Sequence, residues 1–344
     1  MSDDSLVLSW GVPPEEDKFS IYQQSSYQQL IAPRHQAQLR WLKFSRNDAG
    51  ICYLPLQVRS IEFGIYESFS SYGYGGLCGD LIRLSEADVD QLAGFLAQSG
   101  ICSLFVRHSP FLANQDQWPS THLEPNRVTY ESSLPNQEDY EAYLRVLPQK
   151  LRWSVNHARK AGYITEDVSK PLSCNAIEEF YRLYLERMEE NKSDPFYFFD
   201  LTFFRNHFSL LGGQCRLMLV REPVGGSISA GAMFLLDPCS GTVHYHLSAA
   251  SKEGMAAQVM EQLLVTAMFK FSKEGFHRMH LGGGHRLDES DGLSRFKRKF
   301  AQKSLEFKIT KLICDATSYQ AMRKKLVLTG SSLFLIGDAR GYIK

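Results

Sequence analysis

The 344-residue sequence lacks several features that would place it in a specialised class of protein. No apolar run approaches the roughly 18 residues needed to cross a bilayer, so membrane insertion is not expected. The seven cysteines are scattered and never form a C-x-x-C pair, which argues against a zinc ribbon or a disulfide framework. The acidic first residues, 1–4, lack the basic and then apolar order of a signal peptide. These absences predict a cytoplasmic protein.

The chain also lacks net charge. Its 38 lysines and arginines balance 38 aspartates and glutamates, so no cationic field favours nucleic acid as a partner. A hydrophobic content of 44% and a charged content of 22% are ordinary for a globular protein. A chain of 344 residues exceeds a typical single core, which predicts two domains or one duplicated domain. The oligomeric state stays open.

The first half of the chain alternates strand-like and helix-like segments. Ser85 predicts a helix start by capping, and Gly100 lies just past the expected end of that helix. Two further helices are expected on either side of Pro148, at 136–147 and 149–161. Strands are expected at 39–44, 51–58, 101–106 and 127–132.

The second half shows a clear order of elements. It predicts a helix at 175–190, strands at 216–221, 227–236 and 242–248, a long helix at 254–273, a strand at 276–281, a short cationic helix and a strand at 305–309.

A glycine loop joins the strand at 276–281 to the cationic helix. Three consecutive glycines, at 282–284, let the backbone take positive φ and approach a ligand closely. Beyond them Leu293, Phe296 and Phe300 recur at helical spacing, so they share one face with Lys297 next to it. The pattern fits a ligand-binding loop with an anchored lysine, or a glycine turn followed by a solvated basic helix.

Four motifs in this order resemble the FemAB-like branch of the GNAT acyltransferase superfamily, which pairs two such lobes. Members include peptidoglycan bridge-forming aminoacyl transferases and polysaccharide-cluster acyltransferases. The motifs are Tyr-Gly-Tyr-Gly-Gly at 72–76, Leu-Arg…Ala-Arg-Lys-Ala-Gly-Tyr at 151–163, Phe-Tyr-Arg-Leu-Tyr at 180–184 and Leu-Gly-Gly-Gly…Gly-Leu…Phe-Lys…Phe at 281–300.

The resemblance implies a mixed α/β fold with two GNAT-like lobes in tandem, each a twisted mixed sheet flanked by helices. The lobes are expected at 1–168 and 169–344, the second with a C-terminal extension. The implied activity is N-acyl transfer with acyl-coenzyme A as co-substrate and no tightly bound cofactor. The implied donor-binding residues are Ser251, Gly254, Met255 and Ala256, at the start of the long helix. This stretch departs from the family's Gln/Arg-x-x-Gly-x-Gly/Ala pattern, because serine holds the first position.

The strand at 242–248 supplies candidate catalytic residues. Strict alternation places Val243, Tyr245 and Leu247 on one face and His244, His246 and Ser248 on the other. Histidine suits a general base, because its ordinary pKa of about 6.5 lies near neutral pH.

The catalytic candidates are His246, Tyr245, Asp291 and Lys297, with His285 and Asp288 as further candidates for the base. Lys297 is expected to bind a phosphate or to stabilise an oxyanion. A structural role for any single histidine stays open. No metal site is expected, because the His244/His246 pair has no third ligand at a telling spacing.

Acceptor binding is assigned to two segments and one loop residue. On the helix at 149–161, Arg152, Asn156 and Arg159 cluster on one side, and guanidinium groups suit a diphosphate. Tyr72 and Tyr74 are candidates to stack on a base or sugar, and Gly283 completes the set. The alternatives are a solvated basic face for the helix and a tight aromatic turn for the loop.

These observations favour an N-acyltransferase that moves an acyl group from coenzyme A to the amine of a dTDP- or UDP-linked amino sugar, for surface polysaccharide synthesis. The alternatives are an aminoacyl-tRNA-dependent transferase acting on a peptidoglycan precursor and a non-catalytic GNAT-like binding protein.

Overall fold

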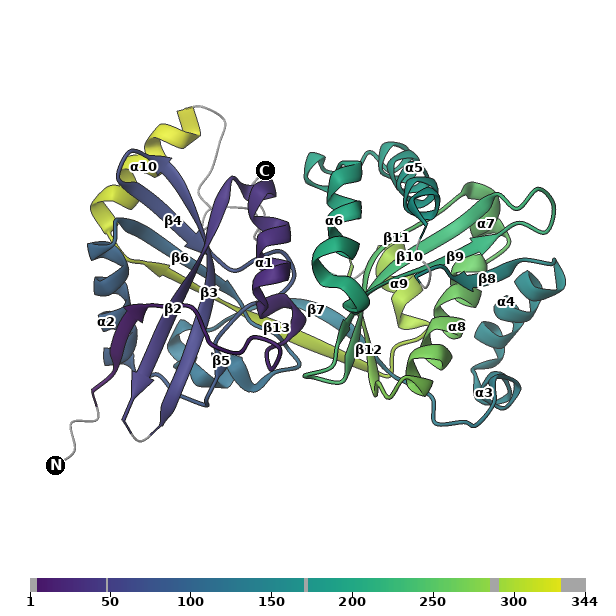
Figure 1. Ribbon diagram of the computed structural model, residues 1–344, viewed down its shortest axis with the longest axis horizontal. Coiled ribbons are helices and arrows are strands. Elements are labelled where there is room, and N and C mark those ends of the chain that lie inside the picture. Colours follow the sequence, from purple (N-terminus) through teal and green to yellow (C-terminus); the bar gives the residue numbers. More distant parts are fainter. Residues whose placement is uncertain (1–4, 48, 170–172, 285–290, 329–344) are drawn as a thin grey trace. The chain divides into compact units, whose positions relative to one another are not determined.

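The computed structural model describes residues 5–47, 49–169, 173–284 and 291–328 (Figure 1). The chain divides into two compact units: unit 1 comprises residues 1–127 and 306–344, and unit 2 comprises residues 128–305. Each unit is a mixed sheet flanked by helices, which confirms the predicted fold class. The units divide the chain at other residues than the expected lobes, because the segment 128–168 packs and pairs within unit 2.

Unit 1 is built on a sheet with the strand order β1-β2-β3-β4-β6-β13, with β5 paired to β3. Only β4 and β6 run parallel among these pairs. Helix α2 connects them and begins at Ser85 with a capping box, as the sequence predicts. The elements are β1 (Val7–Trp10), α1 (Ser25–Ile31), β2 (Ala37–Arg46), β3 (Gly50–Glu62), β4 (Ile65–Phe69), β5 (Cys78–Gly79), α2 (Glu86–Gln98), β6 (Ile101–Arg107), β13 (Lys303–Ile313) and α10 (Ala316–Leu328).

Unit 2 is built on a sheet with the order β7-β12-β11-β10-β9-β8, in which only β11 and β12 run parallel. Its elements are β7 (Glu124–Ser133), α3 (Tyr140–Val146), α4 (Gln149–Lys160), β8 (Ile164–Asp167), α5 (Cys174–Glu190), α6 (Leu201–Leu211), β9 (Cys215–Arg221), β10 (Ile228–Asp237), β11 (Thr242–Ala250), α7 (Lys252–Ala256), α8 (Val259–Lys273), β12 (Arg278–Gly283) and α9 (Gly292–Arg298).

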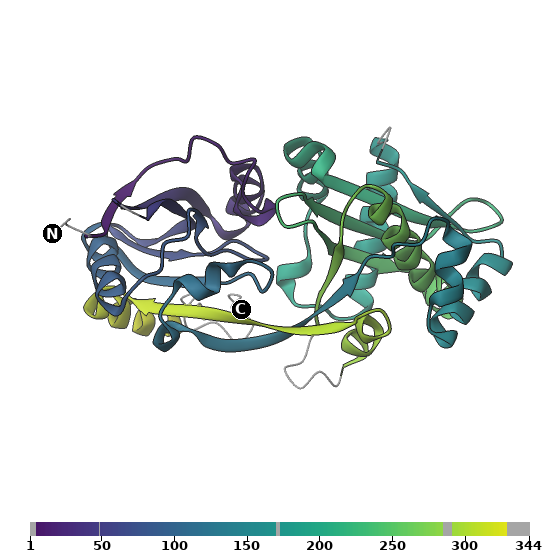
Figure 2. The ribbon, with the colours of Figure 1, turned by 90° about the horizontal axis from the view of Figure 1, so that it is seen from below.

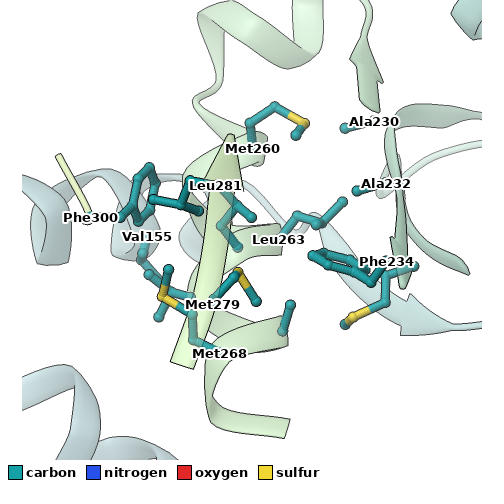
Figure 3. Close-up of a cluster of buried hydrophobic side chains, with 14 of the residues drawn as sticks. Val155, Ala230, Ala232, Phe234, Met260, Leu263, Met268, Met279, Leu281 and Phe300 are labelled. Carbon is teal, nitrogen blue, oxygen red and sulfur yellow. The ribbon is translucent and has the colours of Figure 1, made fainter. Parts of the chain in front are cut away.

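The two faces of the unit 2 sheet are covered by different helices. On one face, Ala232 and Phe234 of β10 belong to one buried hydrophobic cluster with Leu263 of α8 and Val155 of α4, and Figure 3 shows Leu263 beside Phe234. On the other face, Gly231 lies against α5, since a Cβ there would be 2.5 Å from Phe180. We call these the α8 face and the α5/α6 face. The separation matters because the polar side chains described below lie on the α5/α6 face.

In each unit, one strand of the sheet pairs with a strand that is far from it in the sequence. In unit 1, β13 pairs with β6, and in unit 2, β7 pairs with β12. Figure 2 shows both as long strands, β7 in blue-teal and β13 in yellow.

The prediction of one continuous helix at 254–273 is wrong. It is two helices, α7 and α8, separated at Gln258, whose backbone is left-handed with φ +60°. This left-handed residue interrupts the helical backbone, so α7 ends before it and α8 begins after it.

Candidate functional site

The site is centred where β11 and β12 separate. Their parallel ladder covers three residue pairs and ends at His244 opposite His280. The pairing of β11 with β10 shifts register at His246, and that of β12 with β7 shifts at Leu281. Bulges of this kind bend strands and redirect side chains. The two bulges therefore lie just beyond the end of the parallel ladder.

The glycine run that follows is required at every position. Gly282 has φ +74°, a backbone that side chains rarely adopt. A Cβ on Gly283 would be 2.8 Å from the carbonyl oxygen of Val128, and one on Gly284 would be 1.8 Å from Ser294 Oγ. The glycines let this loop approach β7 on one side and α9 on the other.

Lys297 points into this loop. Its ammonium Nζ donates a 2.7 Å hydrogen bond to the carbonyl oxygen of Gly283, and the residue is only 7% exposed. Burial lowers the pKa of Lys297 to about 7, while the nearby Asp291 carboxylate acts in the opposite direction. A buried lysine with this pKa is a candidate functional group rather than a solvated surface cation.

Asp291 holds the helix that carries Lys297. As N-cap of α9, its Oδ1 accepts from the amides of Leu293 and Ser294, and its Oδ2 accepts from the Ser294 hydroxyl. The structure thus gives this carboxylate a positioning role toward Lys297. The other loop candidates, His285 and Asp288, lie outside the described residues.

His246 lies on the α5/α6 face, at the bulge of β11. Its Nε2 is 3.2 Å from Nε2 of His207 on α6. Burial lowers the pKa of His246 well below its ordinary value, and burial also lowers the pKa of His207 to about 4. Both rings are therefore neutral at pH 7.

His244 lies on the same face as His246 and contacts different groups. Its Nδ1 is 3.0 Å from Nδ1 of His280, and Nε2 of His280 is 2.5 Å from the Thr129 hydroxyl. On its other side, Nε2 of His244 is 3.7 Å from a carboxylate oxygen of Asp237. A line of buried polar groups therefore runs across four strands.

Ser248 departs from the predicted alternation. Its hydroxyl accepts a 2.6 Å hydrogen bond from Tyr245, so the two side chains share the α8 face. The extra residue at the bulge reverses the alternation beyond His246. Tyr245 is thus on the opposite face from His246, and burial raises its pKa above the ordinary range.

The expected donor-binding residues form a short helix start. Ser251 caps α7 by accepting from the Gly254 amide at 3.0 Å, and the Met255 amide donates to the Ser251 carbonyl. A Cβ on Gly254 would be 2.4 Å from the carbonyl oxygen of Ser229, so this glycine lets α7 pack on β10. Ala256 is the last residue of α7. Donor binding by these residues stays a prediction.

The arginines of α4 are engaged with α3. Arg152 donates to the carbonyl oxygen of Arg145 at 2.8 Å, and Arg159 forms an exposed 2.8 Å ion pair with Glu141. Asn156, which lies between these two arginines in the sequence, is half-buried. These contacts favour the solvated-face interpretation of the helix.

The aromatic-glycine loop belongs to unit 1 and packs into it. Tyr74 is buried, with edge contacts to Tyr22 and Phe307, and the carbonyl oxygen of Tyr72 accepts from the Tyr27 hydroxyl. These contacts favour the interpretation of the loop as a tight aromatic turn.

Four polar residues of the site were not among the sequence candidates: Thr129, His207, Asp237 and His280. The signal for His280 was available, because it alternates with the apolar Met279 and Leu281 within one strand. His207 lies on α6, which the sequence reading missed, and Thr129 and Asp237 carry no local signal. Among the described residues, no helix is long and apolar enough to cross a bilayer, and no group of His, Cys, Asp and Glu side chains is arranged to hold a metal ion.

Residues 149–298 match the family described as acetyltransferase (GNAT) domain. The match begins at the start of α4 and ends with α9, so it contains Lys297 and lies within unit 2. The chain therefore contains a GNAT acetyltransferase domain, and the protein is an acyltransferase. Such domains use acetyl- or acyl-coenzyme A as co-substrate.

Solved structures share the whole architecture at low sequence identity. FemX is 13% identical with a TM-score of 0.67, covering 92% of this chain and 99% of its own. L-PGS from Bacillus licheniformis is 14% identical with a TM-score of 0.52, covering 88% and 97%. A tandem GNAT protein from the clavulanic acid biosynthesis pathway is 8% identical with a TM-score of 0.50, covering 89% and 98%. At these identities the likeness establishes the fold. No curated protein sequence matches the chain significantly.

Proposed function

We propose that the protein transfers an acyl group from coenzyme A to the amine of a nucleotide-linked amino sugar, with Lys297 as the donor to the oxyanion. The observation that supports this role is the buried Nζ of Lys297, fixed at 2.7 Å from the Gly283 carbonyl beside the separated strands of a GNAT domain.

The chemistry requires one such donor. The lone pair of the uncharged amine attacks the thioester carbon, a C–N bond forms and the carbonyl oxygen becomes an oxyanion. The C–S bond then breaks, and coenzyme A leaves as a thiolate that takes up a proton. An ammonium held in a buried site stabilises the oxyanion more strongly than one in water.

The backbone around the site suits an extended acyl carrier. Beyond His244, β11 continues to Ala250 without pairing to β12. Unpaired strand groups offer hydrogen bonds to an amide-containing substrate. Ser251 and α7 follow directly and present a capped helix start for phosphate oxygens.

Binding and turnover test this proposal together. Thermal-shift titration with acetyl-, propionyl- and longer acyl-coenzyme A, each with and without dTDP- or UDP-amino sugars, is expected to raise Tm for one pair. Release of free thiol with that pair measures turnover. Stabilisation by a thioester without turnover on any amino sugar would reject the acceptor class and keep the donor.

A second candidate function follows from the likeness to FemX, which covers 92% of this chain. Because the FemAB-like branch includes aminoacyl transferases, aminoacyl-tRNA is the alternative donor and a peptidoglycan precursor the alternative acceptor. The balanced charge, 38 basic against 38 acidic residues, weakens this alternative. Charged tRNA that binds with a steep salt dependence and transfers its aminoacyl group would establish it.

A further inference from the structure

A line of four buried polar side chains crosses the unit 2 sheet from β7 to β10. It joins Thr129 to His280 at 2.5 Å, His280 to His244 at 3.0 Å, and His244 to Asp237 at 3.7 Å. None of the four is more than 4% exposed. Apolar residues would fill these positions without the free-energy cost of removing polar groups from water. The buried polar side chains therefore indicate a role beyond packing.

The carboxylate at one end sets the proton positions along the line. Since Asp237 is an acceptor, the relay requires that Nε2 of His244 carries a proton toward it. The 3.7 Å separation is longer than a hydrogen bond, so transfer across it requires the His244 ring to rotate toward the carboxylate. Nδ1 of His244 is then the acceptor for Nδ1–H of His280. Nε2 of His280 in turn accepts the hydroxyl proton of Thr129. The three donors, Thr129, His280 and His244, therefore point their protons in one direction, toward the carboxylate of Asp237.

The two ends of the line lie in different surroundings. Thr129 is the register partner of Gly283, whose carbonyl holds Lys297. Asp237 precedes a turn in which Pro238 and Cys239 are exposed, and it accepts a 2.8 Å hydrogen bond from the Ser240 hydroxyl. One end thus meets the proposed reaction centre and the other end borders solvent.

We propose that Thr129, His280, His244 and Asp237 form a proton relay that carries the proton lost by the acceptor amine to solvent at the turn 238–240. The proposal rests on acyl transfer at Lys297. It assigns separate tasks: Lys297 donates to the oxyanion, and the relay receives the amine proton.

The relay conserves protons at each step. A proton arriving at Thr129 Oγ1 sends the hydroxyl proton to Nε2 of His280. Nδ1–H of His280 then passes to Nδ1 of His244, and Nε2–H of His244 passes to Asp237. Asp237 releases that proton to water. A proton taken from water at Asp237 then passes back along the same groups to the thiolate of coenzyme A, which restores the first tautomers of both rings. One proton enters and one leaves in each direction.

Other titratable groups surround the relay. They are His246 on β11, His207 on α6, Glu131 on β7 opposite His280, and Lys297 on α9. Burial lowers the pKa of His280 well below its ordinary value, and the charge of Lys297 adds to this effect. A neutral His280 is the form that a relay requires.

Asp237→Asn tests the relay with little change in size. We expect kcat to fall on the order of a hundredfold with KM nearly unchanged, because substrate binding does not involve Asp237. Imidazole in the buffer is expected to restore part of the activity of His280→Ala. His108→Asn is the matched control, because it removes a buried histidine that is hydrogen-bonded to a threonine in unit 1. A wild-type kcat in both relay variants would overturn the relay.

Histidine NMR separates the relay from the acyl transfer on which it rests. In ¹⁵N-labelled wild-type protein, His280 is expected as the Nδ1–H tautomer and His244 as the Nε2–H tautomer, and Asp237→Asn is expected to change the His244 signal. The reverse tautomers in the wild type would overturn the proposed direction. If the tautomers are as expected and no thioester supports turnover, the proposed function fails and the hydrogen-bonded line stands.

Discussion

Units 1 and 2 share one plan and differ at the place where their parallel strands separate. In each, a helix connects two parallel strands: α2 between β4 and β6, and α8 between β11 and β12. In each, a histidine next to or within the second parallel strand pairs with a threonine on the distant strand (β13 in unit 1, β7 in unit 2), His108 with Thr310 at 2.8 Å and His280 with Thr129 at 2.5 Å.

In unit 1 the separation is filled by the chain itself. The amide of Ser70 donates to the carbonyl of Phe105, and the amide of Gly75 donates to that of Arg107. The aromatic-glycine loop is thereby bonded along β6. His108 ends in its pair with Thr310, since its Nδ1 has no hydrogen-bond partner within the described part of the chain.

In unit 2 the ladder ends, both strands bulge and a lysine points into the loop. The His280–Thr129 pair continues through His244 toward Asp237. The comparison shows how one fold yields a closed unit and a candidate reactive unit. The difference lies in a few bulges and polar residues rather than in topology.

The largest expected effect is on Lys297, because the proposed role places its ammonium at the reacting carbonyl oxygen. Lys297→Met should lower kcat by about two to three orders of magnitude, the loss typical of one oxyanion donor. Steady-state thiol release measures it, with circular dichroism to check the fold. Lys273→Met, an exposed lysine on α8, is the control. Equal activity of both variants would remove the functional difference between the units.

The pH profile of activity gives the next effect. Because the pKa of Lys297 is lowered to about 7, its ammonium is lost as pH rises through that value. If the ammonium stabilises the oxyanion, kcat should fall about tenfold per pH unit well above pH 7. A rate that instead rises through pH 7 would make neutral Lys297 a base.

Matched glycine substitutions separate stability from chemistry. A Cβ on Gly284 would lie 1.8 Å from Ser294 Oγ, and one on Gly75 would lie 2.5 Å from Ser70 Cβ. Each change to alanine should destabilise the fold by about 1–3 kcal/mol, measured by urea unfolding. Only Gly284→Ala should also lower kcat, because it displaces the cap of α9. A kcat loss in Gly75→Ala would give unit 1 a part in the reaction.

Acid titration tests the buried histidine of unit 1. Burial lowers the pKa of His108 to about 3, below the ordinary 6.5, so the unfolded chain binds a proton that the native protein excludes. The free energy of unfolding should therefore fall as pH drops from 6.5 toward 3, by up to about 1.4 kcal/mol per pH unit. His108→Asn should show a weaker slope in urea unfolding between pH 4 and 7. An unchanged slope would place the acid sensitivity elsewhere.

The smallest effect is expected on α4. Arg159→Ala removes an exposed ion pair with Glu141, which should change stability by about 0.5 kcal/mol or less and leave KM for the acceptor unchanged. Arg152→Ala should behave similarly. A tenfold rise in KM for either variant would restore this helix to the acceptor site.

Local pattern predicted much of the fold and part of the site. The helix start at Ser85 and the strand at 101–106 follow from capping and apolar runs, which depend on neighbouring residues. The bulge at His246 depends on the register of β11 against β10. The pairing of β7 with β12 and of β13 with β6 depends on segments that are distant in the sequence. Lys297 was found because three glycines precede it, whereas Thr129 and Asp237 become site residues only when four strands are brought together.

The pairing of β6 with the distant strand β13 has a consequence for synthesis on the ribosome. The chain is made from its N-terminus, so β6 emerges long before β13, its partner in unit 1. Until residues 303–313 appear, β6 presents an unpaired edge on the β13 side, and such edges invite aggregation. Unit 2, by contrast, begins with β7, so β7 has already been made when its partner β12 emerges. The C-terminal unit can therefore complete its sheet first, and the N-terminal unit last.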